Sequence, residues 1–152
     1  MAIKPLSRSV SIIGFGMTKF GDSSETPELA GMSLQDLGAW ACAVAMEDAG
    51  VNPQQIGKLA LGSVCSPYYN SECMTPVSGF MEFVGMKGKA GVYHNEACAS
   101  AMNAFNEAVE AVASGRYDVA IAVDFDSAVN TQAPNLPSCY RHLGRGGKET
   151  RF

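Results

Sequence analysis

The chain lacks any apolar run near the roughly 20 residues that a membrane-spanning helix needs. The amino-terminal residues Met1–Arg8 include two basic side chains, but no apolar signal segment follows them. We therefore expect a cytoplasmic location. Positive charge is also scarce, because the formal net charge is -4. The sequence thus gives no electrostatic reason to expect nucleic acid or an anionic membrane as a partner.

The chain also lacks the cysteine spacing of a disulfide framework or a zinc knuckle. The number of cysteines is odd and their spacing is irregular: the five are Cys42, Cys65, Cys73, Cys98 and Cys139. Cys139 and His142 form an isolated C-x-x-H pattern without the second half that a structural zinc site requires. We expect no metal site.

Short β-rich runs alternate with longer helical patterns along the chain. Apolar residues make up 47% and charged residues 17%, which is typical of a folded domain rather than a disordered one. Strands are predicted over residues 10–15, 59–64, 90–93 and 118–123, and helices over 33–48, 75–84 and 99–114. This alternation predicts an α/β fold with a mainly parallel sheet.

Two of these elements carry a prediction about burial. Met102, Phe105, Val109 and Val112 recur at helical spacing, so we expect them to form the core-facing stripe of their helix. The run Asp118–Val123 is nearly all apolar, as expected for a strand that is buried on both faces.

The most informative stretch surrounds Cys98, which lies between the predicted strand over residues 90–93 and a helix rich in small residues. The first N–H groups of a helix have no helical partner, and together with the helix dipole they stabilise a thiolate. The thiolate is the nucleophilic form of cysteine. The alternative is a small buried cysteine that packs the start of the helix without any chemistry.

The segment Glu96-Ala97-Cys98-Ala99-Ser100, its small-residue helix and the following Ser114–Val123 resemble the nucleophile segment of the thiolase superfamily. Three earlier segments agree in order and spacing: Val10–Gly21 with the opening strand and turn, Ser33–Gly50 with the first long helix, and Val51–Gly62 with the next turn and strand. The resemblance runs from Val10 to Asp126 and is closest to sterol-carrier-type thiolases and acetyl-CoA acetyltransferases.

The resemblance implies a thiolase-like N-terminal half, with a mainly parallel mixed sheet between helical layers. In the family each half has five strands, so residues 1–126 would form an incomplete half. Residues 127–152 would be the start of a loop region or a flexible tail. The histidine motifs and second cysteine of the family's second half do not occur here, and neither His94 nor His142 matches a catalytic histidine position. Asp124-Phe125-Asp126 replaces the glycine-rich end that is typical of the strand after the nucleophile helix.

The resemblance also implies acyl transfer. Cys98 would be the catalytic nucleophile that takes an acyl group from an acyl-CoA or a 3-oxoacyl-CoA, with the coenzyme A thioester as substrate and no bound cofactor. A homodimer or hetero-oligomer through the region Ala90 to His94 is expected, and a small zinc-ribbon/OB-fold protein is a further partner seen in the family. The alternatives are a non-catalytic thiolase-like module that binds acyl-CoA or a protein, and a redox-sensing thiol protein.

Overall fold

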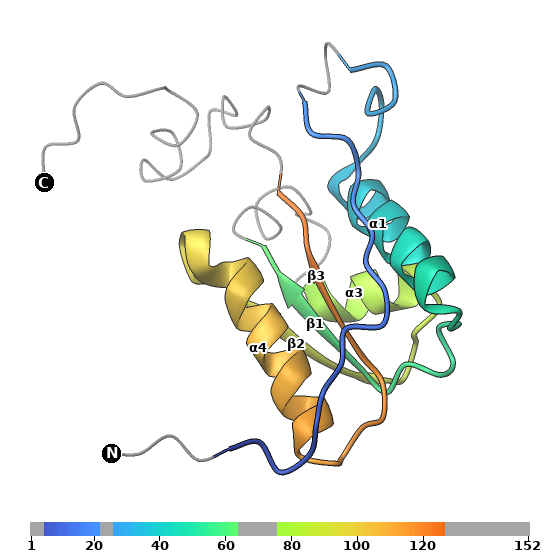
Figure 1. Ribbon diagram of the computed structural model, residues 1–152. Helices are drawn as coiled ribbons and strands as arrows, with labels where there is room; N and C mark the ends of the chain where they lie inside the picture. Colours follow the sequence, from blue (N-terminus) through green and yellow to red (C-terminus); the bar gives the residue numbers. More distant parts are fainter. Residues whose placement is uncertain (1–4, 22–25, 64–75, 127–152) are drawn as a thin grey trace, which may run out of the picture.

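Three parallel strands form the sheet at the centre of the molecule (Figure 1). The computed structural model describes residues 5–21, 26–63 and 76–126. β1 (Lys58–Gly62) lies in the middle, between β2 (Ala90–His94) and β3 (Ala120–Asp124). Both pairings are parallel, and they place His94, Gly62 and Asp124 in one row across the three strands. The predicted α/β fold with a mainly parallel sheet is confirmed.

Helix α1 (Leu34–Ala49) begins and ends where the sequence predicts. The Ser33 hydroxyl accepts a hydrogen bond from the backbone N–H of Asp36, and the Asp36 carboxylate accepts one from the backbone N–H of Ser33. This reciprocal capping box satisfies two backbone donors at the helix start. Gly50 ends the helix in the left-handed conformation (φ 65°), which a residue without a Cβ adopts readily.

Two further helices also agree with the sequence. α3 (Pro76–Phe83) begins at a proline, whose missing N–H costs nothing in the first turn. α4 (Ser100–Ala113) follows a short 3₁₀ turn, η1 (Ala97–Ala99). Within the described ranges, no helix is long and apolar enough to cross a membrane.

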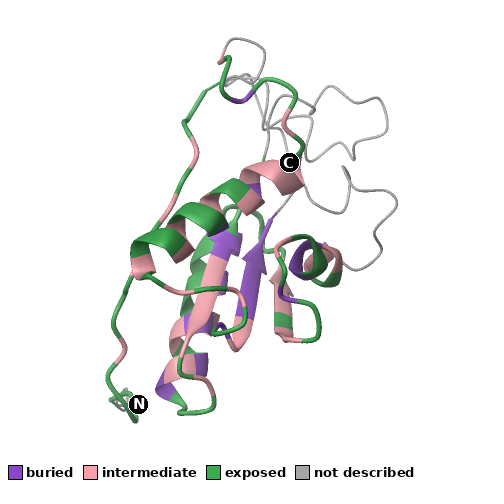
Figure 2. Ribbon diagram, turned by 90° about the vertical axis from the view of Figure 1, so that its right-hand side faces the viewer, coloured by how far each residue is buried: buried purple, intermediate pink, exposed green. Residues whose placement is uncertain are grey.

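The two faces of the sheet are covered differently. The core face packs against α1 and α3, and its cluster includes Leu59, Leu61, Phe80 and Phe125. The rings of Phe80 and Phe125 lie 4.9 Å apart between their centroids. The other side, which we call the α4 face, lies against α4. Buried residues are concentrated on β1 and on the helix surfaces that flank it (Figure 2).

The predicted strand over residues 10–15 is wrong, because this extended segment pairs with no strand in the described part of the chain. It packs against α1 instead. A Cβ atom at Gly14 would lie 2.6 Å from the carbonyl oxygen of Ala45, so only glycine permits this approach. The backbone N–H of Phe15 donates to the carboxylate of Asp48 at 3.1 Å rather than to a neighbouring strand.

The predicted burial of α4 is wrong for half of the stripe, because Val109 and Val112 are half-buried whereas Met102 and Phe105 are exposed. Met102 and Phe105 are 60% and 41% exposed, whereas the buried surface consists of Ser100 and the alanines at positions 104, 108, 111 and 113. Small side chains let the helix approach the sheet closely, and that geometry overrides the apolar stripe in the sequence. β3 is also less buried than predicted, because Val123 is its one buried residue and the other four are half-buried or exposed.

Candidate active site

Cys98 lies in η1, between the end of β2 and the start of α4, and its side chain is exposed. All three strands run in the same direction, so the Cys98 turn lies at the carboxyl edge of the sheet. Ligands of open α/β sheets bind at this edge. The exposed thiol contradicts the interpretation of Cys98 as a buried packing residue.

The backbone before Cys98 has an uncommon conformation. Ala97 has φ 51°, and it is the one non-glycine residue with positive φ in the described part of the chain. A side chain in this region costs roughly 1 kcal/mol, so such residues often mark functional sites. Ser100 closes the turn: its buried hydroxyl donates to the carbonyl of Ala97 at 2.8 Å and accepts from the N–H of Glu96 at 2.9 Å. The Cys98 turn is therefore held by hydrogen bonds on both sides of the thiol.

Gly62 is what allows this turn to lie directly on the sheet. A Cβ atom at Gly62 would lie 2.7 Å from the carbonyl oxygen of Ser100 and 2.8 Å from Oδ1 of Asp124. Real Cβ atoms do not approach these atoms so closely. The start of α4 and the Asp124 carboxyl therefore both use the space that a side chain on the central strand would fill.

The Asp124 carboxyl has a perturbed acidity. Its pKa is raised to about 6, first because desolvation disfavours the charged form and second because the Asp126 carboxylate lies nearby. The row formed by His94, Gly62 and Asp124 places this carboxyl on the α4 face, beside the first residue of α4. A carboxyl with such a pKa can exchange a proton near neutral pH.

Hydrogen bonds among Ser63, Tyr93 and Asp126 connect the residues at the carboxyl ends of the three strands. The Ser63 hydroxyl donates to Oδ1 of Asp126 at 3.0 Å, and the Tyr93 hydroxyl donates to the carbonyl of Ser63 at 2.6 Å. These bonds join the ends of all three strands. They fix the backbone from which Asp124 and the Cys98 turn project.

His94 lies four residues before Cys98, at the end of β2. Its Nδ1 lies 3.7 Å from a carboxylate oxygen of Glu96, a contact that is an ion pair when the imidazole is protonated. Its Nε2 is buried, with no hydrogen-bond partner among the described residues. His94 matches no catalytic histidine position of the family by sequence, and the structure places it beside the Cys98 turn.

Cys42 provides an internal comparison for Cys98. It lies in α1, is 2% exposed, and burial raises the pKa of its thiol to about 12. Cys42 is therefore a packing residue. Cys65, Cys73, Cys139 and His142 lie outside the described residues. Within the described ranges, no group of three or more metal-ligating side chains lies together.

Sequence reasoning found Cys98 but missed Gly62, the role of Ser100 and the altered acidity of Asp124. Strand ends gave a signal for two of the residues, because His94 and Asp124 each directly follow a predicted strand, whereas Gly62 lies within one. Their register across the sheet, which brings them together, is not visible in the sequence.

Residues 10–140 match the family model for the thiolase N-terminal domain, and the chain belongs to this family. The match includes the Cys98 turn and all three strands. The suspected resemblance is confirmed.

The relatives are acetyl-CoA acetyltransferases that are longer than this chain. The protein of Methanothermobacter thermautotrophicus is 29% identical over 84% of this chain and 31% of its own length. That of Methanocaldococcus jannaschii is 32% identical over 75% of this chain and 27% of its own length. The structure of an acetyl-CoA acetyltransferase from Syntrophomonas wolfei is similar, with a TM-score of 0.69 at 24% identity, over 91% of this chain and 34% of that one. The chain thus spans about a third of the length of these relatives.

Proposed function

We propose that this chain is the nucleophile half of a thiolase-type acyl-CoA acyltransferase, with Cys98 forming the acyl-enzyme. The observation that carries the proposal is the exposed Cys98 thiol on a braced turn at the carboxyl edge of the sheet, before a helix of 14 residues. Membership of the thiolase family supports the reaction class.

In the proposed step, the Cys98 thiolate attacks the thioester carbonyl carbon of an acyl-CoA. The new bond joins Sγ of Cys98 to the acyl carbon, the bond from that carbon to the coenzyme A sulfur breaks, and the coenzyme A thiolate leaves and takes up a proton. Dividing the transfer in this way replaces one difficult displacement by two easier ones. The backbone N–H of Cys98, in the turn that precedes α4, is a suitable donor for the oxyanion of the intermediate.

The second half-reaction needs a base that deprotonates the α-carbon of a second acyl-CoA or the thiol of coenzyme A. We propose that polypeptide outside these 152 residues supplies this base. Coenzyme A thioesters act as substrates in this scheme, and no bound cofactor is required.

The region Ala90–His94 is proposed as the interface of a homodimer or hetero-oligomer. β2 is an edge strand in the described sheet, and strand edges promote association through their backbone groups. Light scattering at micromolar concentration tests this proposal, and a monodisperse monomer contradicts it. A zinc-ribbon/OB-fold partner protein and a cytoplasmic location also remain expectations.

The decisive experiment is intact-protein mass spectrometry after incubation with acetyl-CoA and with longer and aromatic acyl-CoAs, followed by peptide mapping. We expect one acyl adduct on Cys98. The Cys98→Ala variant should lose the adduct, whereas the Cys42→Ala control should retain it. An adduct that persists in Cys98→Ala contradicts the assignment of the nucleophile.

The alternative is a non-catalytic thiolase-like module that binds acyl-CoA or another protein. A folded sample that forms no adduct with any acyl-CoA favours this alternative. Rapid oxidation of Cys98 by peroxide, without any acyl adduct, favours a redox-sensing role.

A further inference from the structure

His94 is linked to the Cys98 turn through Glu96. Its Nδ1 lies 3.7 Å from a carboxylate oxygen of Glu96. The backbone of Glu96 holds the turn at two points: its N–H donates to the Ser100 hydroxyl at 2.9 Å, and its carbonyl accepts from the N–H of Ala99 at 3.1 Å. Glu96 therefore connects an imidazole to the backbone that presents the thiol.

The turn needs such support, because two consecutive residues in it have uncommon backbone angles. Glu96 has φ -115° and ψ 44°, and Ala97 has φ 51°. Sparsely populated conformations persist only where the surrounding contacts over-determine them. The Glu96 side chain is 48% exposed, and the contact with His94 restrains its carboxylate. A change in the strength of that contact acts directly on the residue before Ala97.

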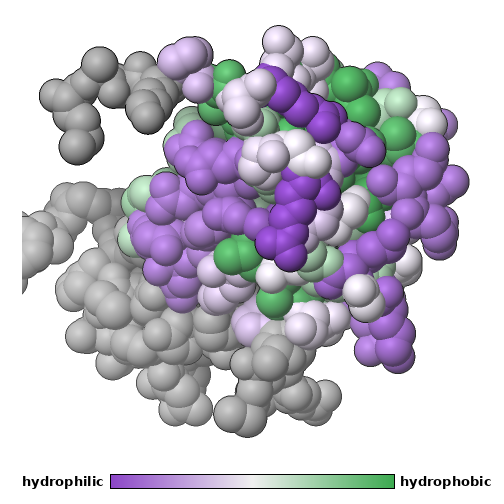
Figure 3. All heavy atoms as spheres, turned by 90° about the horizontal axis from the view of Figure 1, so that it is seen from below, coloured by the Kyte–Doolittle hydropathy of each residue, from purple (hydrophilic) through white to green (hydrophobic). Residues whose placement is uncertain are grey.

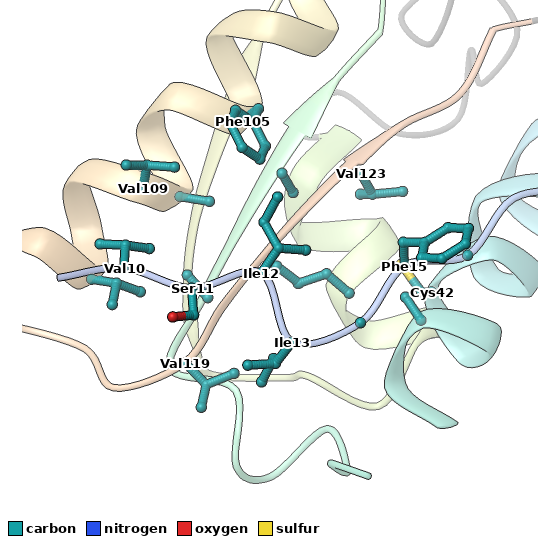
Figure 4. A pocket seen from close by; sticks show the side chains of 18 of the residues that line it. Val10, Ser11, Ile12, Ile13, Phe15, Cys42, Phe105, Val109, Val119 and Val123 are labelled. Atoms are coloured by element: carbon teal, nitrogen blue, oxygen red, sulfur yellow. The ribbon is translucent and has the colours of Figure 1, made fainter. Parts of the chain in front are cut away.

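Helix α4 presents different sides to the two outer strands. Phe105 and Val109 point into a cavity beside β3 (Figure 4). Glu107 lies on the other side of the helix, where it forms an ion pair with Lys58 of β1. The pKa of Glu107 is lowered, first by the hydrogen bond from Lys58 and further by the charges of Lys58 and His94, against the opposing effect of burial. The imidazole of His94 therefore lies near Glu107, on the β2 side of α4.

The charged groups around this imidazole are mainly acidic. Glu96 approaches it from the turn and Glu107 from α4, while Asp124 ends β3 in the same row, beyond Gly62. Lys58 is already paired with Glu107, and α3 packs on the opposite face of β2 with apolar side chains. The charge of an imidazole changes between about pH 5 and 8. The contact with Glu96 is therefore an ion pair in the acidic part of this range and not in the alkaline part.

We propose that His94 is a positioning residue for Cys98. The protonated imidazole attracts the Glu96 carboxylate, and Glu96 then holds the turn in the conformation that presents the thiol. When His94 is neutral, the carboxylate next to the turn is uncompensated, so the turn opens more often and the Cys98 thiolate is less favoured. The inference concerns the reactivity of Cys98 toward any electrophile, and only its bearing on acyl transfer rests on the proposed function.

Amide hydrogen exchange of the 152-residue chain from pH 5 to 8 tests this proposal, with each rate corrected for its intrinsic value. The N–H groups of Glu96 and Ala99 report on the turn, and the N–H of Leu37 in α1 is the internal reference. Relative to Leu37, we expect both turn amides to be protected about two- to fivefold more at pH 5 than at pH 8, which is the effect of a partly exposed ion pair.

Variants separate the charge of the imidazole from its shape. His94→Gln should give the low protection at both pH values, whereas His94→Lys, which keeps a positive charge, should give the high protection at both. Glu96→Gln keeps the backbone hydrogen bonds of the turn and should remove the pH dependence. Glu110→Gln, at an exposed carboxylate of α4, is the matched control and should retain it.

Alkylation of Cys98 gives a second readout. At pH 6, the rate of reaction with iodoacetamide should fall by about two- to fivefold in His94→Gln and should be preserved in His94→Lys. Because neither readout uses an acyl-CoA, failure of this proposal is distinct from failure of the proposed acyl transfer. Equal results for His94→Gln and His94→Lys overturn the proposal, as does a pH dependence that Glu96→Gln retains. A dependence that Asp124→Asn abolishes and His94→Gln retains assigns the effect to Asp124 and also overturns it.

Discussion

The two faces of the sheet perform different tasks. On the core face, large apolar side chains from β1, α1 and α3 pack together, and Leu59, Leu61 and Phe80 are at most 1% exposed. On the α4 face, the contact is made by alanines, a glycine and the partly buried ion pair between Lys58 and Glu107. The core face provides the hydrophobic stability, whereas the α4 face lets the helix that follows Cys98 lie close to the strands. Figure 3 shows the molecule from below, at the end of the sheet away from Cys98. Hydrophilic side chains cover most of this surface, with smaller hydrophobic areas between them.

The largest expected difference between the faces concerns their two cysteines. At pH 8, a thiol whose pKa is about 12 is ionised in roughly one molecule in ten thousand. Because Cys42 is also buried and Cys98 is exposed, we expect iodoacetamide to modify Cys98 at least about a thousandfold faster. Peptide mapping of a time course measures both rates. Comparable rates for the two cysteines would show that Cys42 is readily exposed to solvent, and would contradict the predicted difference in reactivity.

The second prediction compares two phenylalanines. Phe80→Ala leaves a cavity in the core face and should lower the free energy of unfolding by about 3–5 kcal/mol. Phe105→Ala removes a side chain that is 41% exposed on α4 and should cost only about 1 kcal/mol. Urea unfolding followed by circular dichroism measures both. Equal losses would mean that α4 carries as much of the core as α1 and α3.

The third prediction concerns the contact between α4 and the sheet. Gly62→Ala places a methyl group against the Ser100 carbonyl, so we expect a loss of about 1–3 kcal/mol in unfolding free energy and slower acylation of Cys98. Ala101→Ser, at an exposed residue of the same helix turn, should change stability by less than about 0.5 kcal/mol. If Gly62→Ala acylates normally, the close approach of α4 is not needed to place the thiol.

The smallest effect is a dependence of stability on pH from Asp124. Its folded pKa of about 6 lies above the ordinary aspartate value, so the folded state binds more protons between these two values. This contribution to stability is complete below about pH 4 and is lost as the pH rises through about 6. Thermal unfolding from pH 4 to 7 should show the decline in the parent protein and a weaker one in Asp124→Asn.

A change at the neighbouring carboxylate sharpens this measurement. Asp126→Asn removes the second cause of the shift, so it should move the decline of the parent protein to lower pH without abolishing it. Glu110→Gln, at an exposed carboxylate on α4, serves as the control and should leave the profile unchanged. A profile that is the same in all variants would show that Asp124 is well solvated.

Local sequence patterns were enough to predict the helix ends, the order of the elements and the family. The Ser33 cap, the Gly50 stop and the proline at the start of α3 define helix ends through short-range hydrogen bonds and backbone sterics, which neighbouring residues decide. The order of strands and helices gave the fold class, and the segment around Cys98 gave the resemblance that the family match confirms.

Which surfaces are buried, and which distant residues contact one another, depends on long-range packing. The helical period marks Met102 and Phe105 as core, yet the close approach of α4 to the sheet buries the alanines instead. Val10–Phe15 has the composition of a strand. In the structure its backbone packs against α1 at Gly14 and Gly16 and does not pair with β3. The row of His94, Gly62 and Asp124 depends on strand register, a long-range property that no local pattern specifies.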